Sequence, residues 1–440
     1  MDRQESIITL FEYGNWRQVK DKTSLKAFLQ NIWQARVQNL ALGNEADENI
    51  DTRYQPFLKF DDDYVRANNY VGFIQNGDQL IEIYPKVFRN AELEDKAEIL
   101  RQLFYWFRYC RKWRFPFSQA SLGTITDSFP ELIIYLIAKQ IGEIVSTHPF
   151  LQYQPSEEST STPKGTINFG RYISRSFSRG NYHLLDCDYE PFVYDNKVNR
   201  IIKYCCRLLL TRTSIPDTQR IIQEAIFILD DVEDLPCSIH DFETIVFNSF
   251  FEDYKLILDT CKNIIEQQMY SNASYDLSQW SILFPMEYIF EDFVAGFLET
   301  HFGDQVTVEY QKSDLYLSNE PQAFNLQNDI LLTVGDRKII IDTKYKLRDP
   351  SFKTDVKKGV VQSDMYQVLS YAYKRGCTEV ILLYPNLTAI PDSGDSFIVK
   401  SAFSNAPPII VSIFEIPFSG KDMTQLDGLL KKQLKSILGL

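Results

Sequence analysis

Histidine is scarce in this sequence, and its few cysteines are scattered. The 440 residues include four histidines, which lie far apart at His148, His183, His240 and His301. Zinc hydrolases and nucleases with a histidine base need clustered histidines, so neither class is expected. The seven cysteines form no C-x-x-C pair and no zinc-like spacing, which favours reduced thiols in a cytoplasmic protein.

The sequence also lacks a membrane segment, a nucleotide-binding loop and an excess of basic residues. No uncharged apolar run approaches the roughly 20 residues of a membrane span, and the N-terminus has no apolar signal core. We therefore expect a cytoplasmic protein with no membrane partner. No G-x-x-x-x-G-K-[ST] motif occurs, so a nucleotide-driven motor must be another chain. The formal net charge of −13 argues against strong DNA binding by this chain alone.

The composition is that of an ordinary globular protein with more than one domain. Hydrophobic residues make up 44% of the chain and charged residues 24%. A chain of this length suggests two or three domains. We predict a mixed α/β (α+β) fold in three parts: an N-terminal mixed α/β domain over 1–153, a linker loop and helical region over 154–277, and a C-terminal domain over 278–440.

Local patterns predict the elements of the first two parts. Residues 64–88 indicate two strands joined at Asn76-Gly77, a strong signal for a β-hairpin. The segment 154–165, QPSEESTSTPKG, is polar and rich in Ser, Thr and Pro, which predicts a mobile loop or linker. Apolar residues at helical spacing predict helices over 94–113, 130–145, 195–212, 217–229 and 242–268.

Two groups of basic residues stand out against the acidic background. Arg171, Arg175 and Arg179 are four residues apart and would share one face if their segment is helical. The second group consists of Arg101, Arg108, Arg111, Lys112 and Arg114. Each group has two interpretations: its residues contact a partner or DNA, or they are ordinary surface cations, which helix C-termini favour.

The C-terminal part has a different order of elements. A helix over 284–302 precedes a strand around 306–311, and the segment NDILLTVGDRKIIIDTKYK (328–346) then forms a hairpin that turns at Gly335-Asp336. A helix over 360–376 and a strand over 379–385 follow. The predicted order is αβββαβ with a mixed sheet.

The end of this hairpin carries charged residues out of an apolar run. Side chains two apart on a strand share a face, so Asp342 and Lys344 point to the same side as Ile340. The hairpin turn places Asp329, at the start of the paired strand, opposite Asp342. Two carboxylates that converge repel each other unless a cation lies between them. Mg²⁺ is the natural candidate, with Mn²⁺ as a substitute, because it takes carboxylate oxygens, waters and phosphate oxygens as ligands.

Flanking helices offer further candidate side chains. Glu287 and Glu291 are four apart on the helix over 284–302, and we favour Glu291 as an additional acid at the site. Gln367 and Tyr371 are four apart on the helix over 360–376 and could hold a carboxylate or a phosphate. Taken singly, each of these residues could also be an ordinary residue on a helix surface. The Asp342–Lys344 pair could likewise be a solvated charge pair on a surface hairpin.

Together these elements resemble the PD-(D/E)xK nuclease superfamily and its RecB-like branch. Asp342-Thr343-Lys344 matches the second half of the motif, and Asn328-Asp329 replaces the usual Pro-Asp. The chain is also similar to the McrC family, the nuclease subunits of McrBC restriction systems. The middle region, with PKGTINFGRYI where relatives commonly show an Arg-Gly pair, departs from this family. The similarity covers LFEYG (10–14), VGFIQNGDQLIEIYPKV (71–87), DNKVNRIIKYCCRLLL (195–210), PMEYIFEDFV (285–294) and MYQVLSYAY (365–373).

The resemblance implies a metal-dependent endodeoxyribonuclease that cleaves double-stranded DNA. It implies a PD-(D/E)xK restriction-endonuclease-like domain over 278–440, with Asp329 and Asp342 as metal ligands, Lys344 as the catalytic lysine, and Glu291 (also as a ligand) and Gln367 as supporting residues. It also implies a McrB-like hexameric AAA+ GTPase partner, which binds GTP and reads 5-methylcytosine. The chain would dock on this partner through its N-terminal domain (1–153) and stimulate its GTP hydrolysis.

Two other functions remain open from the sequence. The chain could be a regulatory docking subunit with weak nuclease activity, although intact Asp329, Asp342 and Lys344 argue against a vestigial site. It could also be a solitary RecB-like repair nuclease, which the long N-terminal portion and the low pI disfavour.

Overall fold

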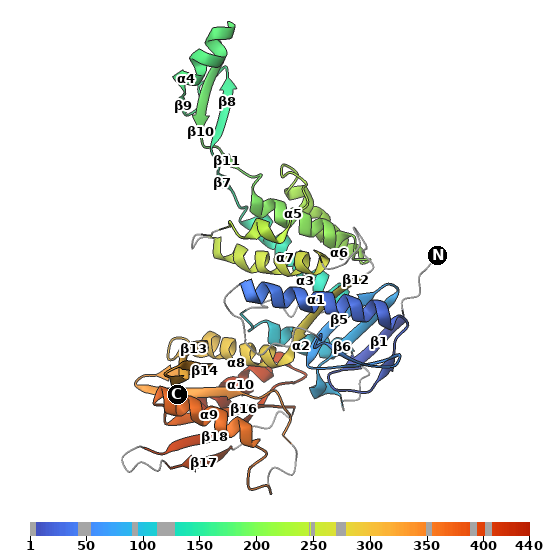
Figure 1. Cartoon of the computed structure of the whole chain (residues 1–440), viewed down its shortest axis with the longest axis vertical. Coiled ribbons are helices and arrows are strands. Elements are labelled where there is room, and N and C mark those ends of the chain that lie inside the picture. The colour runs from blue at the N-terminus through green and yellow to red at the C-terminus, as the bar shows by residue number, and fades with distance from the viewer. Residues whose placement is uncertain are drawn as a thin grey trace. The chain divides into compact units, whose positions relative to one another are not determined.

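The chain, shown as a computed structural model, forms two compact units (Figure 1). The first unit comprises Met1–Phe129 and Ala273–Leu440, and the second comprises Pro130–Asn272. Among the described residues, no helix combines the length and apolar character needed to cross a membrane. The residues that the structure describes are 6–42, 54–89, 96–111, 128–245, 247, 251–269, 279–348, 354–387, 394–400 and 407–440.

The first unit contains both ends of the chain. Its elements before residue 129 are β1 (Ser6–Phe11), β2 (Arg17–Gln18), α1 (Lys22–Leu42), β3 (Leu58–Asp61), β4 (Tyr64–Ala67), β5 (Tyr70–Asn76), β6 (Gln79–Tyr84), η1 (Lys86–Phe88) and α2 (Lys96–Phe107). Its elements after residue 279 are β12 (Gln279–Pro285), α8 (Met286–Phe302), β13 (Thr307–Asn319), β14 (Gln322–Val334), β15 (Arg337–Thr343), α9 (Gln362–Arg375), β16 (Glu379–Asn386), β17 (Asp395–Val399), β18 (Ile409–Pro417) and α10 (Met423–Leu438).

The N-terminal sheet of this unit has the order β1-β6-β5-β12. The predicted hairpin is confirmed, because β5 and β6 pair antiparallel with Asn76 opposite Gln79. The fourth strand, β12, comes from 200 residues further along the chain and was not predicted. Gly72 permits this pairing: its φ is +135°, and a Cβ there would lie 1.9 Å from the carbonyl oxygen of Ile282. The sheet therefore joins the N-terminal part of the chain to the segment that precedes α8.

The second sheet of this unit has the order β13-β14-β15-β16-β18-β17. It is mixed, since β15, β16 and β18 run parallel while the β13–β14–β15 meander and β17 pair antiparallel. The elements α8, β13, β14, β15, α9 and β16 follow the predicted order of helix, three strands, helix and strand. The mixed α/β class is thereby confirmed, while β17, β18 and α10 were not anticipated.

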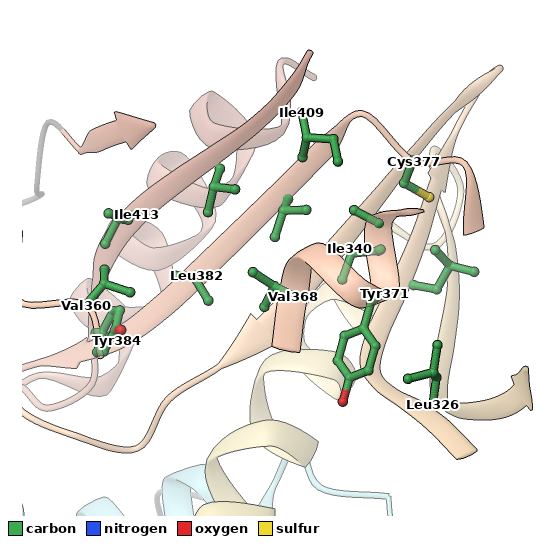
Figure 2. Packing of buried hydrophobic residues seen from close by; sticks show 14 residues of the cluster. Leu326, Ile340, Val360, Val368, Tyr371, Cys377, Leu382, Tyr384, Ile409 and Ile413 are labelled. Carbon is green, nitrogen blue, oxygen red and sulfur yellow. The ribbon is translucent and has the colours of Figure 1, made fainter. Parts of the chain in front are cut away.

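Helices cover both faces of this sheet. On one face, Val368 and Tyr371 of α9 pack against Ile340 of β15 and Leu382 of β16 in one apolar cluster (Figure 2). Helices α8 and α10 contact the sheet strands as well. Ile341, whose side chain alternates with that of Ile340, is equally buried, so the face away from α9 is covered too. The hydroxyl of Tyr371 points away from the apolar side chains of the cluster.

Helix α2 ties the N-terminal part to the C-terminal part of this unit. The indole of Trp106 stacks on Phe418 with ring centroids 3.9 Å apart, and its Nε1 donates a hydrogen bond of 2.8 Å to the Phe418 carbonyl. Gly296 lets α8 approach the chain just after α2, because a Cβ at that position would lie 1.8 Å from the carbonyl oxygen of Tyr109. Burial of these large aromatic rings makes the contact a principal source of stability.

A buried carboxylate lies in the same unit. Glu12 follows β1 directly, and its Oε2 accepts hydrogen bonds from the backbone nitrogen of Lys86 at 2.9 Å and from the hydroxyl of Tyr345 at 3.0 Å. Burial raises the pKa of Glu12 to about 7, although the backbone hydrogen bond and the Lys86 ammonium oppose this shift. A charged group is thus kept inside the unit at a cost in stability.

The second unit is described by itself. It contains several helices and short strands. Its elements are α3 (Phe129–Thr147), β7 (Gln152–Tyr153), β8 (Ser156–Thr160), β9 (Thr166–Ile167), α4 (Phe169–Arg171), η3 (Tyr172–Ser176), η4 (Phe177–Arg179), β10 (Leu185–Tyr189), β11 (Phe192–Val193), α5 (Lys197–Leu210), α6 (Pro216–Ile228), η5 (Ile239–Phe242) and α7 (Glu252–Met269).

The prediction of a mobile loop over 154–165 is wrong for Ser156–Thr160. This segment is strand β8 of a small sheet with the order β8-β10-β9, and Thr160 pairs with Leu185. The strand is polar, so apolar alternation could not reveal it; its partner strand supplies both the backbone pairing and a side-chain hydrogen bond from Ser159 to Asp186.

The arginine row does not lie on one α-helix. Arg171 ends the short α4, Arg175 lies in the π-helical η3, and Arg179 ends the 3₁₀-helical η4. Arg171 forms ion pairs with Glu157 and Asp188, so its charge is compensated locally. The condition for one shared face, a single α-helix, is therefore not met.

The compact units group the chain differently from the predicted three-part division at 153/154 and 277/278. Packing joins the N-terminal part to the region after residue 273, because β12 belongs to the N-terminal sheet. The second unit begins near residue 130, with α3. The three predicted parts were defined by the task expected of each, and this division by task stays a prediction.

The close approach at Gly296 predicts a specific loss of stability. Gly296→Ala should lower the free energy of unfolding by about 1–3 kcal/mol, because the new methyl group overlaps the Tyr109 carbonyl and forces α2 and α8 apart. Gly428→Ala in α10 is the matched control: nothing lies within 4 Å of the new Cβ, and the helix propensity of alanine should add about 0.5–1 kcal/mol. Urea unfolding of both variants measures the contrast. Equal effects of the two substitutions would contradict this packing.

The buried Glu12 predicts a pH dependence of stability. Its pKa is about 7 in the folded chain against an ordinary value of 4.5. Its contribution to stability is therefore fully present below about pH 4.5 and is lost as the pH rises through about 7. Glu12→Gln, which mimics the protonated carboxyl group, should lose less stability than wild type between about pH 5 and pH 8, by on the order of 3 kcal/mol. Parallel pH profiles of the two melting temperatures would refute this.

Candidate functional site

Strands β14 and β15 bring two of the candidate aspartates to the same end of the sheet. Ile330 pairs with Ile341, so the next positions outward are Asp329 and Asp342. The two carboxylates affect each other electrostatically, as the predicted register requires. Asp342 is fully buried at the end of three consecutive isoleucines, a position that an isolated charge does not normally occupy.

Lys344 supplies the positive charge at this end of β15. Its Nζ lies 2.8 Å from Oδ2 of Asp342, and it donates a hydrogen bond of 3.3 Å to Oε1 of Gln367 on α9. Burial lowers the pKa of Lys344, but the carboxylates of Asp342 and Asp329 outweigh burial and raise it above its ordinary value. The side chain therefore remains an ammonium group.

Helix α9 holds Gln367 through a neighbour one turn away. The Nε2 of Gln367 donates a hydrogen bond of 2.7 Å to the hydroxyl oxygen of Tyr371, which the packing of α9 on the sheet fixes in place. The Gln367 amide oxygen is thereby directed to Lys344. The structure thus connects Tyr371, Gln367, Lys344 and Asp342, which the sequence predicted to lie at one sheet end.

Glu291, rather than Glu287, lies with the two aspartates. Burial raises the pKa of Glu291 to about 9, with Asp329 as the next cause and a hydrogen bond from Gln311 opposing the shift. Glu287 is exposed, and its charge acts instead on Glu12 and Lys86. One helical turn of α8 therefore separates an acid that faces the aspartates from one that does not.

Burial disfavours the ionised forms of Asp329, Asp342 and Glu291, which together form the carboxyl cluster. Burial, and then Asp329, raise the pKa of Asp342 to about 7. Burial also raises the pKa of Asp329, whose Oδ2 accepts hydrogen bonds from the backbone nitrogen and hydroxyl of Thr343 at 2.7 and 3.0 Å. Asp329 disfavours ionisation of both Asp342 and Glu291, and Asp342 disfavours that of Glu291, which is the electrostatic setting that a cation relieves.

Two residues of this site were not identified from the sequence. Strand alternation placed Thr343 on the opposite face, yet its hydroxyl reaches Asp329 because β15 ends at this residue. Gln311, which bonds to Glu291, lies in β13 with a φ of +46°, next to a register shift in the β13–β14 pairing. No periodic pattern signals a bulge of this kind, so the sequence offered no route to Gln311.

The donor set fits a hard divalent cation, although the side chains do not form a ready cage. In the described part of the chain, no three His, Cys, Asp or Glu side chains are arranged to hold a metal ion. Oδ1 of Asp342 and Oε1 of Glu291 are nevertheless buried there without a hydrogen-bond partner. Unpartnered carboxylate oxygens from separate elements are suitable ligands for Mg²⁺, which prefers oxygen donors.

The basic residues of the N-terminal part are partly engaged. Arg101 pairs with Glu98, and Arg111 lies 3.1 Å from Glu299 and 5.3 Å from the ring centroid of Tyr310. These contacts support the interpretation as structural cations for both arginines. Lys112 and Arg114 lie outside the described residues.

The sequence profile of one protein family matches most of the chain. Residues 65–385 match the sequence profile of the family described as McrBC 5-methylcytosine restriction system component. Curated proteins give no match.

Two solved structures share the fold. A chain from a refined half-complex of the tetradecameric assembly of Thermococcus gammatolerans McrB AAA+ hexamers with bound McrC is similar with a TM-score of 0.67 and 16% identity, over 98% of this chain and 100% of that one. A chain from the cryo-EM structure of the Thermococcus gammatolerans McrBC complex is similar with a TM-score of 0.50 and 18% identity, over 67% and 87%. At these identities the likeness concerns the fold alone.

The carboxyl cluster predicts stabilisation by Mg²⁺ that depends on Glu291. Wild type should melt at a higher temperature with millimolar Mg²⁺, by the equivalent of about 1.4 kcal/mol at ten times the dissociation constant. Glu291→Gln should gain less from Mg²⁺, because one of the three carboxyl groups that could bind the ion is removed. Glu287→Gln, one turn away and exposed, is the control and should respond to Mg²⁺ as wild type does. The same Mg²⁺ response in all three proteins would exclude Glu291 as a ligand.

Proposed function

The chain belongs to the family of McrBC 5-methylcytosine restriction system components, and from this membership we propose that it is the Mg²⁺-dependent DNA endonuclease of such a system. The observation that carries the proposal is the convergence of Lys344, Asp342, Asp329 and Glu291 at one end of the mixed sheet. Charged side chains in this number are rarely buried together without a catalytic or binding role. The region from α8 onward would then be a PD-(D/E)xK nuclease domain.

The proposed reaction is hydrolysis of a phosphodiester bond in double-stranded DNA. Asp329, Asp342 and Glu291 would hold Mg²⁺, which when bound lowers the pKa of water and polarises the phosphate. The ammonium of Lys344, held by Gln367, would lie where it can orient the attacking water or stabilise negative charge on the phosphoryl oxygens. Burial of the site strengthens these electrostatic interactions relative to water.

The proposed partner is a McrB-like hexameric AAA+ GTPase. The two similar solved structures are described as McrB AAA+ hexamers with bound McrC and as a McrBC complex. The present chain has no phosphate-binding loop of the G-x-x-x-x-G-K-[ST] type, so GTP would be bound and hydrolysed by the partner. Its net charge of −13 supports the same division, because an acidic chain needs help to hold DNA. We further propose that the chain stimulates the partner's GTPase, and that the partner reads 5-methylcytosine.

Cleavage of methylated plasmid DNA with Mg²⁺ and GTP tests the proposal. With the partner present, Asp342→Asn should reduce cleavage by at least about 100-fold, since it removes a ligand and the counter-charge of Lys344. Stimulation of the partner's GTPase should be unchanged. Asp336→Asn, at the exposed turn of the same hairpin, is the control and should cut as wild type does.

The other outcomes each point elsewhere. Full cleavage by Asp342→Asn would refute the assignment of the site to these residues. Cleavage by wild type without the partner would support a solitary repair nuclease instead. Faster GTP hydrolysis by the partner without any cleavage would support a regulatory docking subunit.

A further inference from the structure

A buried hydrogen bond connects the end of β1 to the residue that follows Lys344. The hydroxyl of Tyr345 donates to Oε2 of Glu12 at 3.0 Å, across 333 residues of sequence, and both side chains are buried in the first unit. The backbone nitrogen of Lys86 donates to the same oxygen at 2.9 Å. The N-terminal sheet therefore contacts the end of β15 through a polar group rather than through apolar packing alone.

Each end of this hydrogen bond is held by its surroundings. The backbone nitrogen of Glu12 donates to the Tyr84 carbonyl at 3.0 Å, which continues the pairing of β1 with β6. The ring of Tyr345 lies 6.1 Å from that of Phe290 and 6.2 Å from that of Phe418, and Nζ of Lys86 lies 4.3 Å from its centroid. The Tyr345 hydroxyl thus has a defined position relative to the N-terminal sheet.

The position of Tyr345 affects that of Lys344 because they are consecutive residues at the end of a strand. Their side chains leave the backbone on opposite sides, Tyr345 toward Glu12 and Lys344 toward Asp342. The backbone nitrogen of Lys344 donates to the Leu383 carbonyl at 2.8 Å, which holds the peptide group before Lys344. A rotation of the backbone at Tyr345 would move the ammonium of Lys344 away from its partners.

The Glu12–Tyr345 pair is a costly way to fill this space. Burial of a carboxylate and a hydroxyl costs more than burial of apolar groups of the same size, and phenylalanine would fill the aromatic surroundings of Tyr345 as well. Oε1 of Glu12 is buried and has no hydrogen-bond partner among the described residues, so the carboxylate is only partly compensated. Stability alone does not account for this pair, whereas control over position does.

We propose that Glu12 and Tyr345 are positioning residues for the nuclease reaction: their hydrogen bond holds Lys344 against Asp342 and Gln367, and so couples the geometry of the site to the N-terminal sheet. The inference rests on the proposed nuclease function. Neither residue is a member of the carboxyl cluster, so each would act on the rate of cleavage through the placement of Lys344. A displacement of about 1 Å in a catalytic group can cost on the order of 100-fold in rate.

The test measures cleavage by the full chain with its GTPase partner, at varied DNA concentration. Tyr345→Phe should lower the rate at saturating DNA by about tenfold or more, while the DNA concentration for half-maximal rate changes less than about twofold. Glu12→Gln keeps an oxygen acceptor for the Tyr345 hydroxyl and should stay within about threefold of wild type. Glu12→Met removes the acceptor at similar volume and should lose as much rate as Tyr345→Phe. The double variant Glu12→Met/Tyr345→Phe should be no slower than either single variant, because both remove one shared interaction.

Tyr105→Phe provides a matched control for loss of a buried hydroxyl. Tyr105 also donates to a carboxylate, Asp427 at 2.9 Å, and this contact likewise joins the N-terminal part to the C-terminal part of the first unit. It does not involve β15. Tyr105→Phe should therefore lower the melting temperature without lowering the cleavage rate at a temperature where the protein is folded.

Several results would overturn the inference. Cleavage by Tyr345→Phe at the wild-type rate would do so. A loss of cleavage rate in Tyr105→Phe equal to that in Tyr345→Phe would also do so, as would equal losses of rate in Glu12→Gln and Glu12→Met. If Tyr345→Phe does not fold, the contrast between Glu12→Gln and Glu12→Met decides the question. An absence of cleavage by wild type with its partner would refute the proposed function and this inference together, whereas normal wild-type cleavage with unimpaired Tyr345→Phe would refute the inference alone.

Discussion

The pairing of β12 with β5 is the constraint on which the rest of the first unit depends. β12 completes the N-terminal sheet and passes without a loop into α8, the helix that carries Glu291. The backbone nitrogen of Met286, at the start of this helix, donates to the Asn69 carbonyl at 3.1 Å. Because strand and helix are continuous, the position of α8 over the second sheet is set by the N-terminal sheet. The two sheets are for this reason parts of one compact unit.

The candidate site is held together by charges that burial makes costly. Burial and neighbouring acids raise the pKa of both Asp342 and Glu291. Without a compensating positive charge, each side chain would therefore be either protonated or a source of instability. The Lys344 ammonium compensates one of these charges, and Thr343 satisfies part of Asp329. Acidic oxygen atoms without a hydrogen-bond partner remain on Asp342 and Glu291, and the proposed Mg²⁺ would use them as ligands. Burial of several acids together is typical of functional sites.

Parts of the site followed from the sequence because they depend on local rules. The turn at Gly335-Asp336 and the alternation of β15 determine that Asp329 and Asp342 lie opposite each other, and helical spacing relates Gln367 to Tyr371. The choice between Glu287 and Glu291 could only be a preference, because both positions lie on one broad face of α8. The packing of α8 against the sheet decided it, by burying Glu291 among the aspartates and leaving Glu287 exposed.

By itself, the sequence determined the mixed α/β class, the order of elements in the C-terminal part, and the hairpin with its Asp329, Asp342 and Lys344, since turns and periodicity act over a few residues. It also carried enough of the McrBC pattern for the family to be recognised. Only the tertiary structure decided that residues 279–285 complete the N-terminal sheet, that Ser156–Thr160 form a strand, and that Glu12 bonds to Tyr345. These features pair segments separated by tens to hundreds of residues, and such pairings depend on the shape and hydrogen-bonding needs of the partner segment, which no local pattern contains.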